Sequence, residues 1–146
     1  SAEGNGMIVT LDTTFFVLHY FSKEESILSK TRRVLYNCRK LGSKGILPTM
    51  VLGEFYALTH KRTGREVAEK HFNEMMNSGL SIIELTAEIS KQAAILRSRY
   101  EERVPWGDCI IAATGVLYKA EAVVTEDPHF KQIKEAKAKA LDEVKI

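Results

Sequence analysis

Four carboxylates lie at points of the chain where an apolar segment ends or a helical segment begins. They are Asp12, Glu54, Asp108 and Asp127. Carboxylates are the hard oxygen ligands that Mg²⁺ and Mn²⁺ take, and such ions usually bind through a few of them together with a phosphate of the substrate. If the four acids converge, the chemistry that they predict is metal-assisted attack of water on a phosphate ester.

Each acid also has an ordinary structural explanation. Asp12 and Asp127 can each cap the N-terminus of a helix, and Asp108 falls in the first turn of a predicted helix, where the helix dipole favours a negative charge. Glu54 differs because it lies in the apolar part of its helix, beside Phe55. An unpaired charge is costly to bury there, so Glu54 needs either a basic partner or a cation.

Polar neighbours of these acids are candidates to complete the site. Thr125 and Thr13 can hydrogen-bond a carboxylate or a metal-bound water, although Thr125 is equally well explained as a β-branched strand residue. Glu126 is expected to point away, because successive residues of a strand face opposite sides. The four histidines share no ligand spacing, and among them only His129 is a candidate for contact with substrate.

The bulk properties describe one globular domain. The chain has 146 residues, of which 45% are hydrophobic and 27% charged, enough to bury a proper core. Residues 1–6 are small and polar and precede Met7, so we interpret them as the remnant of an expression tag and expect a single domain over residues 7–146. A net charge of +2 permits a phosphate-backbone partner without demanding one.

The sequence predicts neither a membrane span nor a disulfide. No segment approaches the roughly 20 apolar residues that a span needs, and no basic residue precedes the apolar segment 7–21, which Asp12 interrupts. Cys38 and Cys109 belong to no CxxC motif, and we interpret them as reduced, buried thiols. We therefore expect a cytoplasmic protein.

Short apolar segments alternate with helical ones along the chain. Strands are expected at residues 8–11, 45–48, 80–85 and 122–125, with a last edge strand near 140–141. Helices are expected at residues 15–21, 22–41, 49–58, 63–78, 87–103 and 106–119, with a short one from Pro128; Ser22 and Thr63 open capping boxes and Thr49 caps a helix.

This alternation implies a parallel sheet covered by helices on both faces, which is a three-layer α/β/α sandwich. In such sheets ligands bind beyond the carboxyl ends of the strands, where the strand order reverses. Asp12 and Asp127 follow the carboxyl ends of two predicted strands, which places both acids at the expected ligand-binding edge.

Four short motifs occur in a fixed order along the chain. They cover residues 8–13 (IVTLDT), 51–55 (VLGEF), 107–113 (GDCIIAA) and 124–130 (VTEDPHF). Each motif alone is weak, but all four in this order resemble the PIN-domain ribonucleases, and most closely the VapC-type toxins of toxin–antitoxin pairs. The motifs span nearly the whole chain after Met7.

The resemblance implies a PIN-like parallel sheet of five strands in the order 3-2-1-4-5, with the first and fourth strands adjacent at the switch point. It also implies an endoribonuclease that requires Mg²⁺ or Mn²⁺, with the four acids as catalytic residues and Thr125 as the accompanying hydroxyl. We expect Asp12, Asp108 and Asp127 to hold the ion that activates water, and Glu54 to orient that water or accept its proton. The sequence leaves open whether one or two ions bind.

The expected partners follow from the same resemblance. They are an RNA substrate, a small antitoxin that caps the acidic pocket with an Arg or Lys, and a second copy of the chain packed through the helices after the second and third strands. Lys61, Arg62 and Arg65 are the first candidates for RNA phosphate contacts, although a solvated helix face explains such residues too. Tyr56 or Trp106 are candidates for stacking on a base.

Two other phosphate chemistries fit the residues less well. A phosphatase of the haloacid-dehalogenase type needs a second Asp two positions after the first, where this chain has Thr14, and a two-component receiver needs an Asp after the third strand, where the chain offers Glu84. A non-catalytic PIN-like module that binds RNA or protein, and a housekeeping RNA-processing nuclease, remain as alternatives.

Overall fold

Five strands form one parallel sheet at the centre of the molecule. The computed structural model describes residues 6–101 and 103–145, so Gly6 alone of the suspected tag remnant falls within the described part. The strands are β1 (Ile8–Leu11), β2 (Lys44–Pro48), β3 (Ser81–Ile83), β4 (Ala122–Val124) and β5 (Ala138–Lys139). Their order is β3-β2-β1-β4-β5 and every pair is parallel, as predicted.

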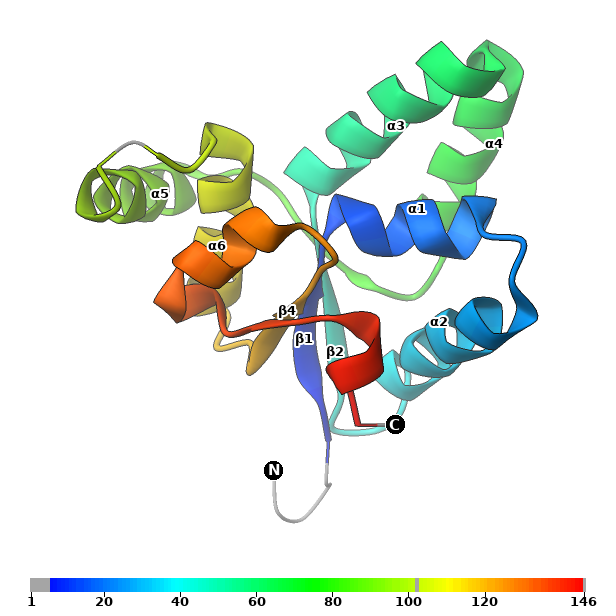
Figure 1. Cartoon of the computed structure of the whole chain (residues 1–146), viewed down its shortest axis with the longest axis horizontal. Helices are drawn as coiled ribbons and strands as arrows, with labels where there is room; N and C mark the ends of the chain where they lie inside the picture. Colours follow the sequence, from blue (N-terminus) through cyan, green and yellow to red (C-terminus); the bar gives the residue numbers. More distant parts are fainter. Residues whose placement is uncertain (1–5, 102, 146) are drawn as a thin grey trace.

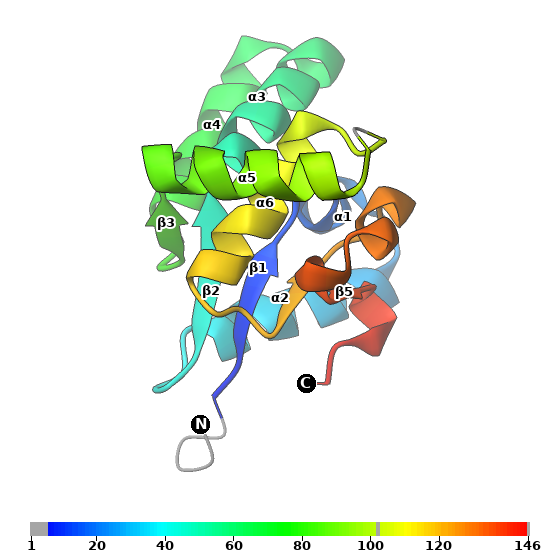
Figure 2. The same ribbon diagram turned by 90° about the vertical axis from the view of Figure 1, so that its left-hand side faces the viewer.

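Helices cover both faces of this sheet (Figure 1). They are α1 (Thr13–Phe21), α2 (Glu25–Cys38), α3 (Thr49–Thr63), α4 (Arg65–Met76), α5 (Ala87–Arg99) and α6 (Trp106–Leu117), followed by the short 3₁₀ helices η1 (Pro128–Gln132), η2 (Lys134–Ala136) and η3 (Leu141–Glu143). In Figure 1 the strands β1 and β2 stand between α1 and α2 on one side and α5 and α6 on the other. Helices α3 and α4 form a hairpin beyond the carboxyl ends of the strands, as Figure 2 also shows.

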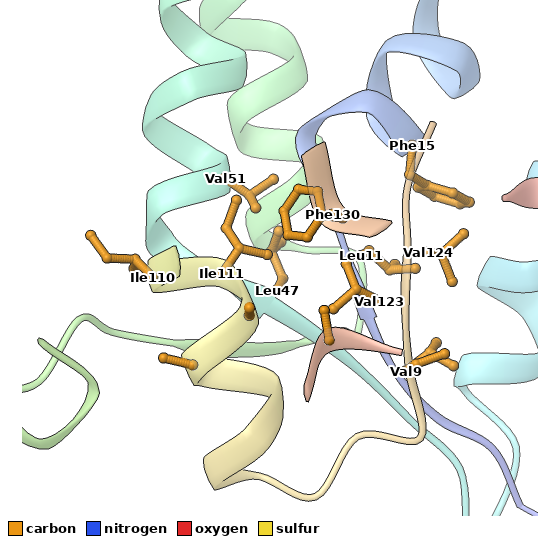
Figure 3. Packing of buried hydrophobic residues seen from close by; sticks show 14 of the residues in the cluster. Val9, Leu11, Phe15, Leu47, Val51, Ile110, Ile111, Val123, Val124 and Phe130 are labelled. Carbon is orange, nitrogen blue, oxygen red and sulfur yellow. The ribbon is translucent and has the colours of Figure 1, made fainter. Parts of the chain in front are cut away.

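The core lies between the sheet and its helices. Leu11 of β1 and Val123 of β4 are buried, and they lie among residues from α6 and from the segment after β4, including Ile111 and Phe130 (Figure 3). The central strands are apolar almost throughout because a parallel sheet with helices on both faces exposes neither side to water. Cys38 and Cys109 are free, buried thiols, as predicted.

Three predicted helix caps are wrong. Helix α2 begins at Glu25 rather than at Ser22, whose hydroxyl accepts the N–H of Glu24 outside the helix. Helix α4 begins after Gly64, whose φ of 92° turns the chain tightly between α3 and α4. The Thr63 hydroxyl donates to the carbonyl of Thr59 within α3 instead of capping α4. Thr49 is the first residue of α3, and its hydroxyl accepts the N–H of Leu85 instead of capping the helix.

The other differences concern ends of elements. β3 comprises residues 81–83 rather than 80–85, and β5 lies at 138–139 rather than near 140–141, because Leu141 begins η3. Helix α2 ends at Cys38 and α5 at Arg99, and the left-handed φ of 56° at Glu101 does not continue a helix. None of the helices in the described part of the chain is both long and apolar enough to span a membrane.

Candidate active site at the carboxyl ends of β1 and β4

Asp12 and Thr125 are brought side by side by the pairing of β1 with β4. Leu11 lies opposite Val124 in this pairing, and the N–H of Asp12 donates to the Val124 carbonyl at 3.2 Å. Each strand therefore ends at the same level of the sheet, and the next residue of each turns its side chain toward the other. The Thr125 hydroxyl donates to Oδ2 of Asp12 at 2.7 Å.

Hydrogen bonds from two threonine hydroxyls hold the Asp12 carboxylate in place. The Thr14 hydroxyl donates to Oδ2 of Asp12 at 2.9 Å and accepts the N–H of Glu126 at 2.9 Å, while the Thr125 hydroxyl accepts the N–H of Asp127 at 2.9 Å. Asp12 is also the N-cap of α1, as predicted. Burial raises the pKa of Asp12, and the hydrogen bonds from Thr125 and Thr14 oppose that rise because they stabilise the ionised form.

Glu54 faces the same region from α3. Its Oε1 accepts a hydrogen bond from the Thr13 hydroxyl at 2.6 Å, so its described partner is a hydroxyl rather than a Lys or Arg. Its other oxygen approaches the start of α6, where a Cβ on Gly107 would lie 2.6 Å from Oε2. Burial raises the pKa of Glu54, with further increases from the charges of Asp12 and Asp127 and a decrease from the Thr13 hydrogen bond.

Asp108 enters from the first turn of α6 with a buried oxygen that lacks a hydrogen-bond partner. The residue is 8% exposed, and within the part of the chain that the structure describes its Oδ2 makes no hydrogen bond. Burial raises the pKa of Asp108 to about 7, and the charges of Asp127, Asp12 and Glu54 add to that rise, whereas His129 lowers it. All four predicted acids therefore act on one another electrostatically at one place.

Asp127 and His129 complete the site from the turn after β4. Asp127 caps η1 by accepting the N–H of His129 at 2.9 Å, and Nδ1 of His129 lies 2.9 Å from the same oxygen, Oδ1. Nδ1 of His129 lies 4.0 Å from Oδ2 of Asp108. One ligand atom from each of Asp108, Asp127 and His129 lies within 4.8 Å of the other two.

This donor set fits a divalent cation. Neighbouring carboxylates raise the pKa of Glu54 and of Asp108, and a nearby positive charge would stabilise the ionised forms. The buried Oδ2 of Asp108 needs a donor or a cation. Asp108, Asp127 and His129 form the group with metal-ligand spacing among the described residues, and Asp12 stands beside it rather than within it. The structure thus brings the four acids together but gives them different surroundings.

A match to a family model identifies the protein family. The model of the PIN domain matches residues 9–136, which includes most of β1, the strands β2, β3 and β4, all six α-helices and every acid of the site. This chain belongs to the PIN-domain family. A search of the curated proteins finds no match.

Solved structures of low sequence identity share the fold of this PIN domain. A chain from the crystal structure of VapBC2 from Rickettsia felis, bound to a DNA fragment from their promoter, has a TM-score of 0.72 at 20% identity, covering 92% of this chain and 98% of that chain. A chain of DNA-bound VapBC from Salmonella typhimurium has a TM-score of 0.73 at 15% identity, covering 92% of this chain and 98% of that chain. VapC20 from Mycobacterium tuberculosis, described as a sarcin–ricin-loop-cleaving toxin, has a TM-score of 0.68 at 19% identity, covering 84% of this chain and 92% of that chain.

The predicted basic residues lie outside the acidic site of the PIN domain. Lys61, Arg62 and Arg65 are exposed at the tip of the α3–α4 hairpin, which projects away from the sheet (Figure 1). Since a helix rises 1.5 Å per residue, Lys61 lies about 10 Å along α3 from Glu54. The Arg62 guanidinium lies 5.3 Å from the centre of the Phe21 ring, which also gives it a packing role.

Some residues of the site have roles that their positions in the sequence did not indicate. In the sequence, Thr14 marked only the position where a haloacid-dehalogenase phosphatase would need an Asp, yet its hydroxyl links Asp12 to the chain after β4. Gly107 permits the close approach of α6 to Glu54, and the signal that could have revealed it is a glycine directly before a site acid in a first helical turn. Trp106 is 48% exposed, with the Arg97 guanidinium 4.9 Å from the centre of its ring.

Proposed function

We propose that this PIN domain is a metal-dependent endoribonuclease and the toxin of a toxin–antitoxin pair. The observation that carries the proposal is the convergence of four acids at the switch point of the sheet. One of them has a buried oxygen without a hydrogen-bond partner among the residues that the structure describes. A set of this kind is costly to assemble without a cation. The shared fold with VapC20, which is described as a cleaving toxin, supports a nuclease.

The residues divide the work as follows in this proposal. Asp108 and Asp127 would hold a Mg²⁺ or Mn²⁺ ion, with Asp12 beside them. Such an ion would supply a lower pKa for water and a positive charge for the phosphate. Glu54 accepts the proton that the attacking water loses, since burial and neighbouring charge make it a stronger base than an ordinary glutamate. Thr13 aims the Glu54 carboxylate, and Thr125 and Thr14 keep Asp12 from turning away.

The start of α6 adds a second attraction for phosphate. Asp108 lies in its first turn, and the free N–H groups and the dipole of a helix N-terminus favour a bound anion. Gly107 leaves this end of the helix without a side chain on the Glu54 side. A phosphodiester bound between α6 and Glu54 would thus have the positive end of the α6 dipole on one side and the Glu54 base on the other.

Cleavage of a pooled RNA library tests the proposal. Purified, antitoxin-free protein with Mg²⁺ or Mn²⁺ should cut RNA, and Asp12→Asn and Asp108→Asn should each lower the rate by at least about 100-fold, because each removes a charge from the ion's surroundings. Glu84→Gln, which removes an exposed acid after β3, should cut like the parent protein. No cutting by the parent protein would favour a binding module, and equal cutting by the two Asn variants would indicate a contaminating nuclease.

An antitoxin is the proposed protein partner. Chains of the same fold occur in VapBC complexes from R. felis and S. typhimurium. A small protein that places an Arg or Lys among the four acids would compete with the ion for the same charge. A small neighbouring gene that encodes a DNA-binding segment would favour the toxin, and its absence would favour a housekeeping RNA-processing nuclease acting on cytoplasmic RNA.

A further inference from the structure

We infer that His129 is a direct nitrogen ligand of the divalent cation, so that this chain has a mixed oxygen–nitrogen site that selects Mn²⁺ over Mg²⁺. The inference rests on the proposed function in that it concerns the same ion, and it names a ligand that the four-acid scheme does not contain. Three independent features of the turn after β4 and of α6 support it.

The first feature is the spacing of the ligand atoms. Two atoms that share a Mg²⁺ or Mn²⁺ ion lie about 3 Å apart when they are adjacent and about 4 Å apart when they are opposite, because each metal–ligand distance is about 2.1 Å. Nδ1 of His129 is hydrogen-bonded to Oδ1 of Asp127 at 2.9 Å and lies 4.0 Å from Oδ2 of Asp108. With the ring proton on Nε2, an ion would take the place of this hydrogen bond, and the Nδ1 atom would stand at ligand distance from both oxygens without a change of fold.

The second feature is the unsatisfied oxygen of Asp108. Its Oδ2 is fully buried, and within the described residues no donor reaches it. Nδ1 of His129 lies 4.0 Å from this oxygen, which is too long for a hydrogen bond. A buried carboxylate oxygen without a hydrogen bond needs another favourable contact, and a cation bound by both Oδ2 of Asp108 and the imidazole of His129 would provide it.

The third feature is the rigidity of the Asp127-Pro128-His129 turn. Pro128 is the first residue of η1, and its ring fixes the backbone between the two ligands. The N–H of Asp127 donates to the Thr125 hydroxyl, and the N–H of His129 donates to Oδ1 of Asp127. Carboxylate and imidazole are thus held by the backbone as a preformed pair, which lowers the entropy lost when an ion binds.

A nitrogen ligand changes which ion the site prefers. Mg²⁺ takes oxygen ligands almost exclusively, whereas imidazole binds first-row transition metals well. An all-carboxylate site discriminates little between Mg²⁺ and Mn²⁺, and replacement of one oxygen by the imidazole of His129 favours Mn²⁺. The half-exposed His129 side chain, 49% exposed, lies where an entering ion can reach it.

Pulsed electron paramagnetic resonance on Mn²⁺ bound to the metal-stripped, full-length protein, without RNA, tests the inference. The parent protein should show the nitrogen coupling of a directly bound imidazole, and His129→Gln should lose it, although glutamine can still hydrogen-bond Asp127. His60→Gln, an exposed histidine on α3, is the matched control and should keep the coupling. Calorimetry should show Mn²⁺ binding weakened about tenfold in His129→Gln, with a much smaller change for Mg²⁺.

Several results overturn the inference. They are the absence of nitrogen coupling in the parent protein, persistence of the coupling in His129→Gln, equal weakening of Mn²⁺ and Mg²⁺, and failure of Mn²⁺ to bind at all. Circular dichroism of each variant confirms that it is folded. RNA cleavage is measured separately. A protein that shows the nitrogen coupling but cuts no RNA would contradict the proposed nuclease activity and leave His129 as a metal ligand. A protein that cuts RNA without the coupling would contradict only the role of His129.

Discussion

At the scale of single residues, Asp108 carries an electrostatic cost in the metal-free fold. Burial and three neighbouring carboxylates raise its pKa to about 7, from an ordinary value near 4. The folded chain therefore holds this proton up to about pH 7, while the unfolded chain releases it near pH 4. The group thus lowers the stability of the metal-free fold as pH rises from about 4 to about 7, and the loss is complete above that range.

Asp108→Asn should therefore stabilise the metal-free protein at pH 8. Asparagine has no proton to lose, so we expect the free energy of unfolding to rise by about 1–3 kcal/mol at pH 8 and to change little at pH 4.5. Thermal unfolding in EDTA at the two pH values measures the difference. Glu84→Gln is the control, since this exposed acid should show no such dependence. A destabilised Asn variant at pH 8 would contradict the electrostatic account.

The sequence could predict which acids form the site but not how they are held. Each of the four lies near the end of a strand or the start of a helix, and in a parallel sheet with this strand order such positions lie together at the carboxyl ends of the strands. The link from Thr14 to the N–H of Glu126 joins positions more than 100 residues apart, and no local pattern encodes it. His129 was expected only as a possible substrate contact, because its pairing with Asp108 depends on where α6 docks.

At the scale of elements, the contact between α3 and α6 sets the position of Glu54. Gly107 at the start of α6 leaves just enough room for the Glu54 carboxylate, whereas Gly53, its counterpart on α3, has no atom within 4 Å of the place where a Cβ would lie. The two glycines therefore differ in what surrounds them, although each directly precedes a site acid in its helix.

Gly107→Ala should reduce cleavage more than it reduces stability. The added methyl group displaces a flexible carboxylate, so we expect a stability change within about 1 kcal/mol but a cleavage rate at least about tenfold lower, since the bond from Thr13 is lost. Gly53→Ala should instead stabilise the fold by about 0.5–1 kcal/mol, because alanine favours helix and meets nothing. Unfolding and single-turnover cleavage are measured on both variants. If Gly107→Ala cleaved RNA as fast as the parent protein, the proposed role of Glu54 would be contradicted.

The tip of the α3–α4 hairpin should contribute to RNA affinity without taking part in the chemistry. Replacing Lys61 and Arg65 by alanine removes two exposed cations about 10 Å or more from Glu54 along the hairpin. Each lost contact with single-stranded phosphate lowers the slope of log affinity against log salt by about 0.7, so the pair should lower it by about 1.4. The cleavage rate of bound RNA should not change. An unchanged slope would show that these residues form only a solvated helix face.

At the scale of the whole molecule, the layered architecture and strand order were predictable, while the ends of elements were not. Apolar strands that alternate with helices allow few arrangements, and the order β3-β2-β1-β4-β5 follows the family resemblance. The predicted capping boxes at Ser22 and Thr63 failed because both residues belong to the end of the preceding helix. Ser22 is the C-cap of α1, and Thr63 is the last residue of α3 before the turn at Gly64. The predicted homodimer stays a prediction.

The measurement that tests the central claim most directly is a titration of Mn²⁺ into the metal-stripped protein, followed by RNA cleavage and by thermal unfolding in parallel. One ion site that neutralises the four acids should restore cleavage and raise the unfolding temperature with the same midpoint, because the bound ion stabilises the fold by mass action. Asp108→Asn should shift both midpoints together to higher Mn²⁺. Full cleavage in EDTA, or a cleavage midpoint that Asp108→Asn leaves unchanged, would contradict a metal-dependent nuclease built on these carboxylates.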